Sequence, residues 1–72
     1  MSVELYTLPD CGICHMIKTK LEEKHIDFEE KDFNQVAESM GLDRAPLLLV
    51  NSGAGQLLFM SPAKMVDWIN KQ

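Results

Sequence analysis

The chain has 72 residues, of which 46% are hydrophobic and 25% are charged, and its formal net charge is -4. This length suits one domain with a small core, and the acidic balance argues against nucleic acid or an acidic membrane surface as a partner, because both bind basic patches. No segment approaches the roughly 20 apolar residues of a membrane span, and the first residues lack the basic and apolar regions of a secretory signal. We therefore expect one domain over residues 1–72, monomeric and cytoplasmic.

The chain begins with a strand pattern followed by a helix pattern. The apolar run Val3–Leu8 ends at Pro9 and suits a buried central strand. An amphipathic helix follows and ends near Lys24. Its apolar residues at helical spacing are Ile13, Met16, Ile17 and Leu21.

A second strand and helix are expected next. Residues 26–31 alternate, with Ile26 and Phe28 on one face and charged side chains on the other, as in a half-exposed strand. Asp32 is expected to cap a short helix that ends at Gly41.

The last third of the chain predicts a hairpin and a final helix. The apolar runs Leu47–Val50 and Gln56–Met60 flank a turn and should pair as antiparallel strands. Ser61 as N-cap and Pro62 as first helical residue open the last helix. The predicted fold is therefore α/β, in the order βαβαββα, with a four-stranded mixed sheet flanked by three helices.

A C-x-x-C motif, Cys11-Gly12-Ile13-Cys14, lies at the junction of the first strand and the first helix. Two cysteines at this spacing on the first turn of a helix lie on one face, close enough to form a disulfide. The free amides and dipole of a helix N-terminus favour negative charge, so the pKa of the Cys11 thiol is expected below the roughly 8.5 of a free thiol. This predicts a redox centre in which Cys11 attacks a substrate disulfide and the less exposed Cys14 resolves the mixed disulfide.

Other uses of the cysteines are less favoured. With His15, the motif is also the C-x-x-C-H string that attaches c-type haem, for which Met40, Met60 or His25 would supply the second axial ligand. The surrounding strand patterns and the absence of an export signal argue against haem. We expect no metal site, because zinc usually needs four ligands, and a structural disulfide would not require this spacing at such a junction.

Three neighbours are candidates for tuning the pKa of the thiols. Lys18 lies one turn beyond Cys14, and its positive field would favour the thiolate. Asp10 is placed to cap the helix, but its negative charge beside Cys11 would oppose ionisation. His15 is expected to be a partly exposed surface residue with a modest effect.

Two segments carry a resemblance to a known family. One is Tyr6–Lys18, with its Cys-x-x-Cys-His-x-x-Lys motif, and the other is Arg44–Val50, with Ala-Pro before an apolar strand. Almost the whole chain resembles the glutaredoxin branch of the thioredoxin-fold proteins, and these segments are most similar to the NrdH-type redoxins. The resemblance implies the thioredoxin fold and a dithiol oxidoreductase that reduces protein disulfides, with ribonucleotide reductase as the implied substrate.

The resemblance also implies which residues contact the substrate. Pro46 would follow a cis peptide bond and face the cysteines, and the backbone of Ala45 would pair with the substrate as a short strand does. Arg44 and Ala45 are kept extended before the proline. The other implied contact positions are Pro9, Gly12, Ile13 and Ser61.

Departures from the family concern the electron source. Glutaredoxins that use glutathione commonly carry a lysine where this chain has Leu8, and a glycine pair that is missing from residues 59–64. The amides of Ser61 and Ala63 at a helix N-terminus could still hold a carboxylate of glutathione. The chain also departs from the NrdH-type group, because it lacks that group's tryptophan-containing signature before the last helix. We therefore expect thioredoxin reductase as the electron source, glutathione as the alternative reductant and no bound cofactor. A haem carrier or an iron-sulfur dimer held by Cys11 and glutathione is the third possibility.

Overall fold

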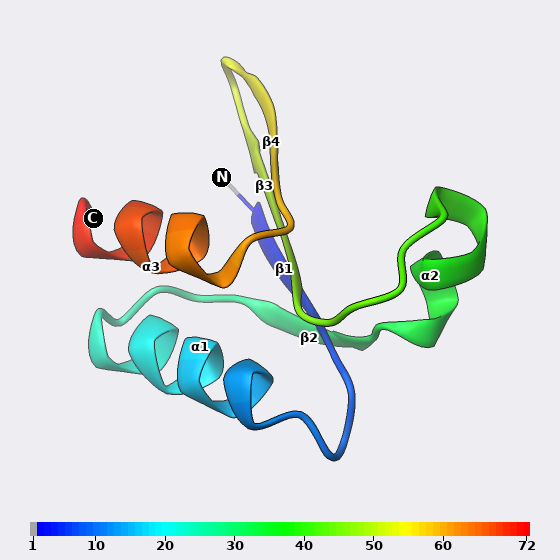
Figure 1. Cartoon of the computed structure of the whole chain (residues 1–72). Coiled ribbons are helices and arrows are strands. Elements are labelled where there is room, and N and C mark those ends of the chain that lie inside the picture. The colour runs from blue at the N-terminus through cyan, green and yellow to red at the C-terminus, as the bar shows by residue number, and fades with distance from the viewer. Residues whose placement is uncertain (1) are drawn as a thin grey trace.

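The computed structural model describes residues 2–72 and shows the predicted order βαβαββα. The strands are β1 (Ser2–Thr7), β2 (Glu29–Asp32), β3 (Leu47–Ser52) and β4 (Gly55–Phe59), and the helices are α1 (Gly12–Glu23), α2 (Asn34–Met40) and α3 (Pro62–Asn70). Together they form the expected α/β thioredoxin fold, with one four-stranded mixed sheet (Figure 1).

The sheet has the strand order β2-β1-β3-β4, so the predicted central strand β1 lies inside it. β1 is parallel to β2, as a crossover through α1 requires, and antiparallel to β3, which forms a hairpin with β4. Because of these directions, the C-terminal ends of β1, β2 and β4 and the N-terminal end of β3 meet at one edge of the sheet. The segment with the cysteines leaves the sheet at this edge.

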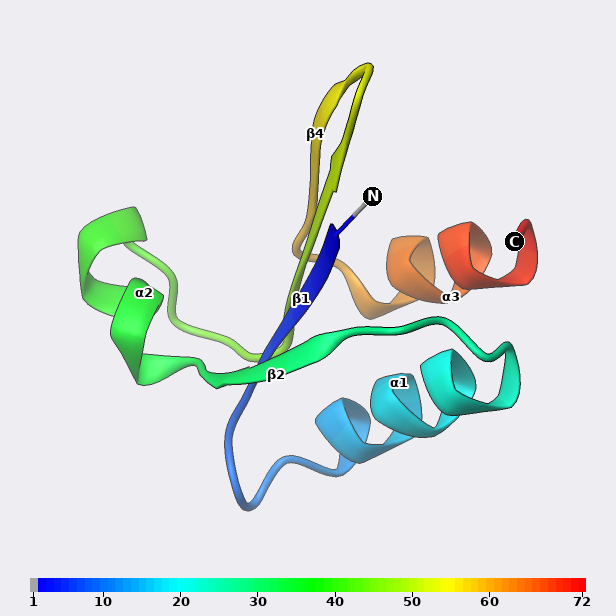
Figure 2. The same ribbon diagram turned by 180° about the vertical axis from the view of Figure 1, so that it is seen from behind.

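Helices α1 and α3 cover one face of the sheet, and α2 lies on the other, as the two opposite views show (Figures 1 and 2). The main core lies between the sheet and the helices α1 and α3. Its buried members are Val3, Leu5, Ile17, Leu21, Leu48, Val50, Met65 and Ile69. Tyr6, Phe33 and Leu47 are the buried members of a second, smaller hydrophobic cluster. Neighbouring strand residues such as Leu5 and Tyr6 thus enter different clusters, as the two-residue period of a strand requires.

Two predicted boundaries differ from the structure. β2 begins at Glu29 instead of residue 26, although Ile26 and Phe28 pack on the main core; their alternation reflected burial and not strand pairing. The N-cap of α2 is Phe33 and not Asp32, although Asp32 Oδ1 still accepts a hydrogen bond from the Asn34 amide (3.0 Å), the first amide of the helix.

Other helix ends follow the sequence pattern. Gly41 ends α2 with a φ of 66°, a left-handed conformation that suits glycine. Ser61 is the N-cap of α3 and Pro62 its first residue, as predicted. Over residues 2–72, no helix has the length and apolar character needed to cross a membrane.

Candidate active site

Cys11 and Cys14 lie where α1 begins, at the edge of the sheet described above. Pro9 follows the end of β1, and the Cys11 amide donates to the Leu8 carbonyl (3.3 Å), which turns the chain from the strand into the helix. The His15 amide donates to the Cys11 carbonyl (3.3 Å), so the helical hydrogen bonds start at Cys11 itself. The motif therefore occupies the N-cap and first turn of α1.

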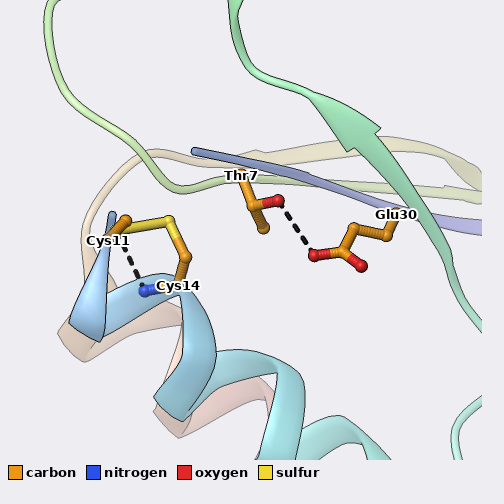
Figure 3. The surroundings of a disulfide bond; sticks show 4 residues. All are labelled: Thr7, Cys11, Cys14 and Glu30. Atoms are coloured by element: carbon orange, nitrogen blue, oxygen red, sulfur yellow. Dashed lines mark hydrogen bonds between the residues drawn. A yellow bond between two sulfur atoms is a disulfide. The ribbon is translucent and has the colours of Figure 1, made fainter. Parts of the chain in front are cut away.

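The two cysteines form a disulfide, with a Cα–Cα distance of 5.2 Å (Figure 3). Cys11 is the N-cap of α1, and its Sγ accepts a hydrogen bond from the Cys14 amide (3.1 Å). Cys14 is 2% exposed, whereas Cys11 is half-buried, so the predicted order of accessibility is confirmed. In the reduced protein the same amide and the helix dipole would favour a thiolate on Cys11.

The prediction that Asp10 caps α1 is wrong, because Cys11 occupies that position. A cysteine sulfur is a weak acceptor, but three residues of spacing place it over the Cys14 amide. Asp10 is exposed, next to the cap. The amide of Cys14, in the first turn of the helix, is thus bonded to the Cys11 sulfur and not to a carboxylate.

The Ala45–Pro46 segment lies at the same edge of the sheet as the motif. Tyr6 pairs with Leu47, so Pro46 comes just beyond the last pair of these two strands, next to where the chain departs towards Cys11. The Ala45–Pro46 peptide bond is cis, as the family resemblance implied. Pro46 is buried, Ala45 packs against the smaller cluster, and Arg44 is exposed.

Ser61 reaches this edge from the other side of the sheet. Phe59, the last residue of β4, pairs with Leu48 near the start of β3, so Met60 and Ser61 continue towards the edge that carries the motif. The Ser61 side chain makes no capping hydrogen bond, and its carbonyl accepts from the Met65 amide (3.0 Å). The topology thus brings the beginning of α3 to the same end of the molecule as the cysteines.

The stripe of apolar residues on α1 differs from the expected one. Cys14, Ile17 and Leu21 are the buried residues of the helix, whereas Ile13 and Met16 are 48% and 40% exposed. Gly12 has open space where a Cβ would lie. The first two turns of α1 thus carry two exposed apolar side chains, two and five residues after Cys11.

The three candidates for tuning the thiols have different surroundings. His15 is exposed, as predicted. Lys18 does not stand alone beside the cysteines, because its Nζ forms an ion pair with Glu30 Oε1 at 3.1 Å. Glu30 Oε2 in turn accepts a hydrogen bond from Thr7 Oγ1 at 3.0 Å (Figure 3).

Glu30 is the site residue that sequence reasoning missed. It pairs with Leu5 in the parallel register, which places it on the face of the sheet that α1 covers. The sequence contained one signal for this position. In the alternating segment 26–31, Glu30 falls on the same face as the apolar residues Ile26 and Phe28. Its side chain stays 40% exposed, and it forms an ion pair with Lys18 and accepts a hydrogen bond from Thr7.

We predict a pH dependence of stability from this carboxylate. The hydrogen bond from Lys18 first, and then that from Thr7, holds the pKa of Glu30 below its ordinary value of 4.5. A carboxyl with a lowered pKa stabilises the fold above the unfolded-state pKa, and this stabilisation is lost as the pH falls through the folded-state value. In urea unfolding, the advantage of the wild type over Glu30→Gln should be present above pH 4.5 and disappear at lower pH.

The size of this effect is limited by solvent. The side chains of Lys18 and Glu30 are 36% and 40% exposed, so the difference should not exceed about 1 kcal/mol. An advantage that persists unchanged at pH 3 would contradict the ion pair as its source.

Within the part of the chain that the structure describes, no three His, Cys, Asp or Glu residues gather closely enough to hold an ion.

Comparisons with known proteins agree on the type of fold. A family model described as glutaredoxin matches residues 3–44, which is more than half of the chain and includes both cysteines. Among solved structures, the chain is similar to a trimeric glutathione transferase, TDR1 of Leishmania, with a TM-score of 0.74 and 14% identity. The match covers 97% of this chain but only 17% of that protein's length. A search of curated proteins found no match.

Proposed function

Because the chain belongs to the glutaredoxin family of thiol-disulfide oxidoreductases, we propose that it reduces disulfide bonds of proteins with the Cys11–Cys14 dithiol. The observation that carries the proposal is the position of Cys11: its half-buried sulfur caps α1, while Cys14 is buried one turn later. The family match spans the motif, which favours redox exchange over haem attachment at the same residues.

The proposed reaction transfers two electrons in two steps. The Cys11 thiolate attacks one sulfur of the substrate disulfide, a mixed disulfide forms, and the other substrate sulfur leaves as a thiolate that takes up a proton. Cys14 then loses its proton and attacks Cys11 Sγ, which releases the second substrate thiolate. The protein is left with the Cys11–Cys14 disulfide seen in the structure.

A protein is the proposed substrate because of the surface around Cys11. Ile13 and Met16 offer exposed apolar side chains on the first two turns of the helix that Cys11 caps. Arg44 and Ala45 precede β3 and belong to no strand, so their backbone is placed to pair with an extended segment of a partner. The remaining proposed contacts, Pro9, Gly12, Pro46 and Ser61, come from segments that the topology brings to the same end of the sheet.

Ribonucleotide reductase is the substrate that the similarity to NrdH-type redoxins suggests, and we propose the cytoplasm as the site of action. We propose thioredoxin reductase as the electron donor. Leu8 is half-buried at the position where glutathione-dependent glutaredoxins commonly carry a lysine, so one cation for the tripeptide's carboxylates is missing. Glutathione is the alternative donor.

The choice of donor is tested by following NADPH oxidation during the reduction of insulin. One assay contains thioredoxin reductase, and the other contains glutathione with glutathione reductase. We expect the faster turnover with thioredoxin reductase, and we expect Leu8→Lys to raise only the glutathione-dependent rate. Turnover with glutathione alone would contradict the proposed donor. A visible absorption band of the purified protein would instead support a haem or iron-sulfur carrier.

A further inference from the structure

Glu30 joins the two ends of the segment that carries the cysteines. Thr7, which donates to Glu30 Oε2 at 3.0 Å, is the last residue of β1 before the motif. Lys18, whose Nζ lies 3.1 Å from Glu30 Oε1, is four residues beyond Cys14 and therefore on the same side of α1. One carboxylate on β2 thus contacts residues on both sides of the disulfide in the sequence; Figure 3 shows its contact with Thr7.

The ion pair changes the charge near the buried sulfur. An ammonium one turn from Cys14 would by itself favour the ionised thiol, and a carboxylate in the same place would oppose it. Since Glu30 and Lys18 are paired, their fields largely cancel at the cysteines. The cancellation depends on both charges being present.

Other charged groups near Glu30 are engaged elsewhere or exposed. Lys31 on β2 pairs with Glu4 and Glu29. Asp32 accepts from the Asn34 amide, and both Asp32 and His15 are exposed. With Glu30, Lys31 and Thr7, they line a hollow of about 420 Å³ beside the loop that precedes Cys11. Of the residues that line this hollow, Thr7 is bonded to the carboxylate of Glu30, and Lys18 on α1 is its second partner.

We propose that Glu30 is a positioning residue of the redox centre: it holds the Lys18 side chain, neutralises its charge and thereby sets the fraction of the cysteines that is ionised in the reduced protein. The proposal rests on the redox function of Cys11 and Cys14, but it concerns a residue outside the motif and outside the contacts with substrate.

The test is the pH dependence of alkylation in two single variants and one double variant. Glu30→Gln keeps an oxygen that accepts from Thr7 and removes only the negative charge, so its alkylation profile should move to lower pH. Lys18→Gln removes the positive charge, and its profile should move to higher pH. We expect about a twofold to threefold change in the iodoacetamide rate below the midpoint in each case, because the pair is partly exposed.

The double variant Glu30→Gln/Lys18→Gln should return close to the wild-type profile, since both charges are gone. Higher salt should reduce the difference between the single variants and the wild type. Glu23→Gln, at the other end of α1, is the control for the loss of one exposed carboxylate and should leave the profile unchanged. Circular dichroism shows whether each variant is folded.

Opposite shifts in the two single variants support the proposal. Shifts in the same direction, or an unchanged profile in either folded variant, would overturn it and assign the ion pair a structural role alone. These outcomes differ from failure of the redox function, in which the wild-type thiols would themselves react no faster than free cysteine.

Discussion

Replacing Cys11 by serine is expected to abolish disulfide reduction with either electron donor. A serine hydroxyl at the same N-cap position keeps the helix start, because serine is a good capping residue, but it does not ionise at neutral pH and forms no disulfide. Insulin reduction followed by turbidity measures the loss. A variant that retains the wild-type rate would contradict the role assigned to Cys11.

Cys14→Ser is the matched variant, since it makes the same chemical change three residues later. Cys11 remains able to attack, but no resolving thiol follows, so a mixed disulfide with the substrate should accumulate. Non-reducing electrophoresis and mass spectrometry detect this adduct and identify Cys11 as its site. Accumulation in Cys11→Ser instead would reverse the roles of the two cysteines.

Leu5→Ala is expected to remove most of the stability of the fold. Leu5 is fully buried in the main core, on the central strand that contacts both neighbouring strands. Truncating a buried leucine costs about 2 to 5 kcal/mol, and a core of this size supplies roughly 3 to 5 kcal/mol in total. The midpoint of urea unfolding, followed by circular dichroism, should therefore fall sharply.

Leu57→Ala is the control for this experiment, because it makes the same truncation on the edge strand β4, where Leu57 is 49% exposed. Its unfolding midpoint should stay close to that of the wild type. Equal losses in both variants would show that the core is not organised as described.

The topology was predictable because local signals were strong. The apolar run at Val3–Leu8, the proline after it and the helix pattern beyond Ile13 each favoured one structure, and they agree with β1 and α1. Ser61 and Pro62 similarly predicted where α3 begins. Such features depend on neighbouring residues in the sequence and need no knowledge of distant contacts.

The parts that failed depend on contacts between distant elements. Ile13 and Met16 have the spacing of a buried stripe, yet the buried residues of α1 are Cys14, Ile17 and Leu21, and the last two belong to the main core. The same limitation hid Glu30, whose partners lie 12 and 23 residues away in the sequence. The cap of α1 was missed because Asp10 is the stronger acceptor, whereas the turn at Leu8 places Cys11 at the helix start.

The central claim is that reduced Cys11 is an anion at neutral pH because it caps α1. The most direct measurement reduces the protein, removes the reductant and follows alkylation by iodoacetamide at pH 7, with peptide mapping to assign each site. We predict that Cys11 reacts faster than free cysteine and before the buried Cys14. Reaction of both thiols at or below the rate of free cysteine would contradict the account.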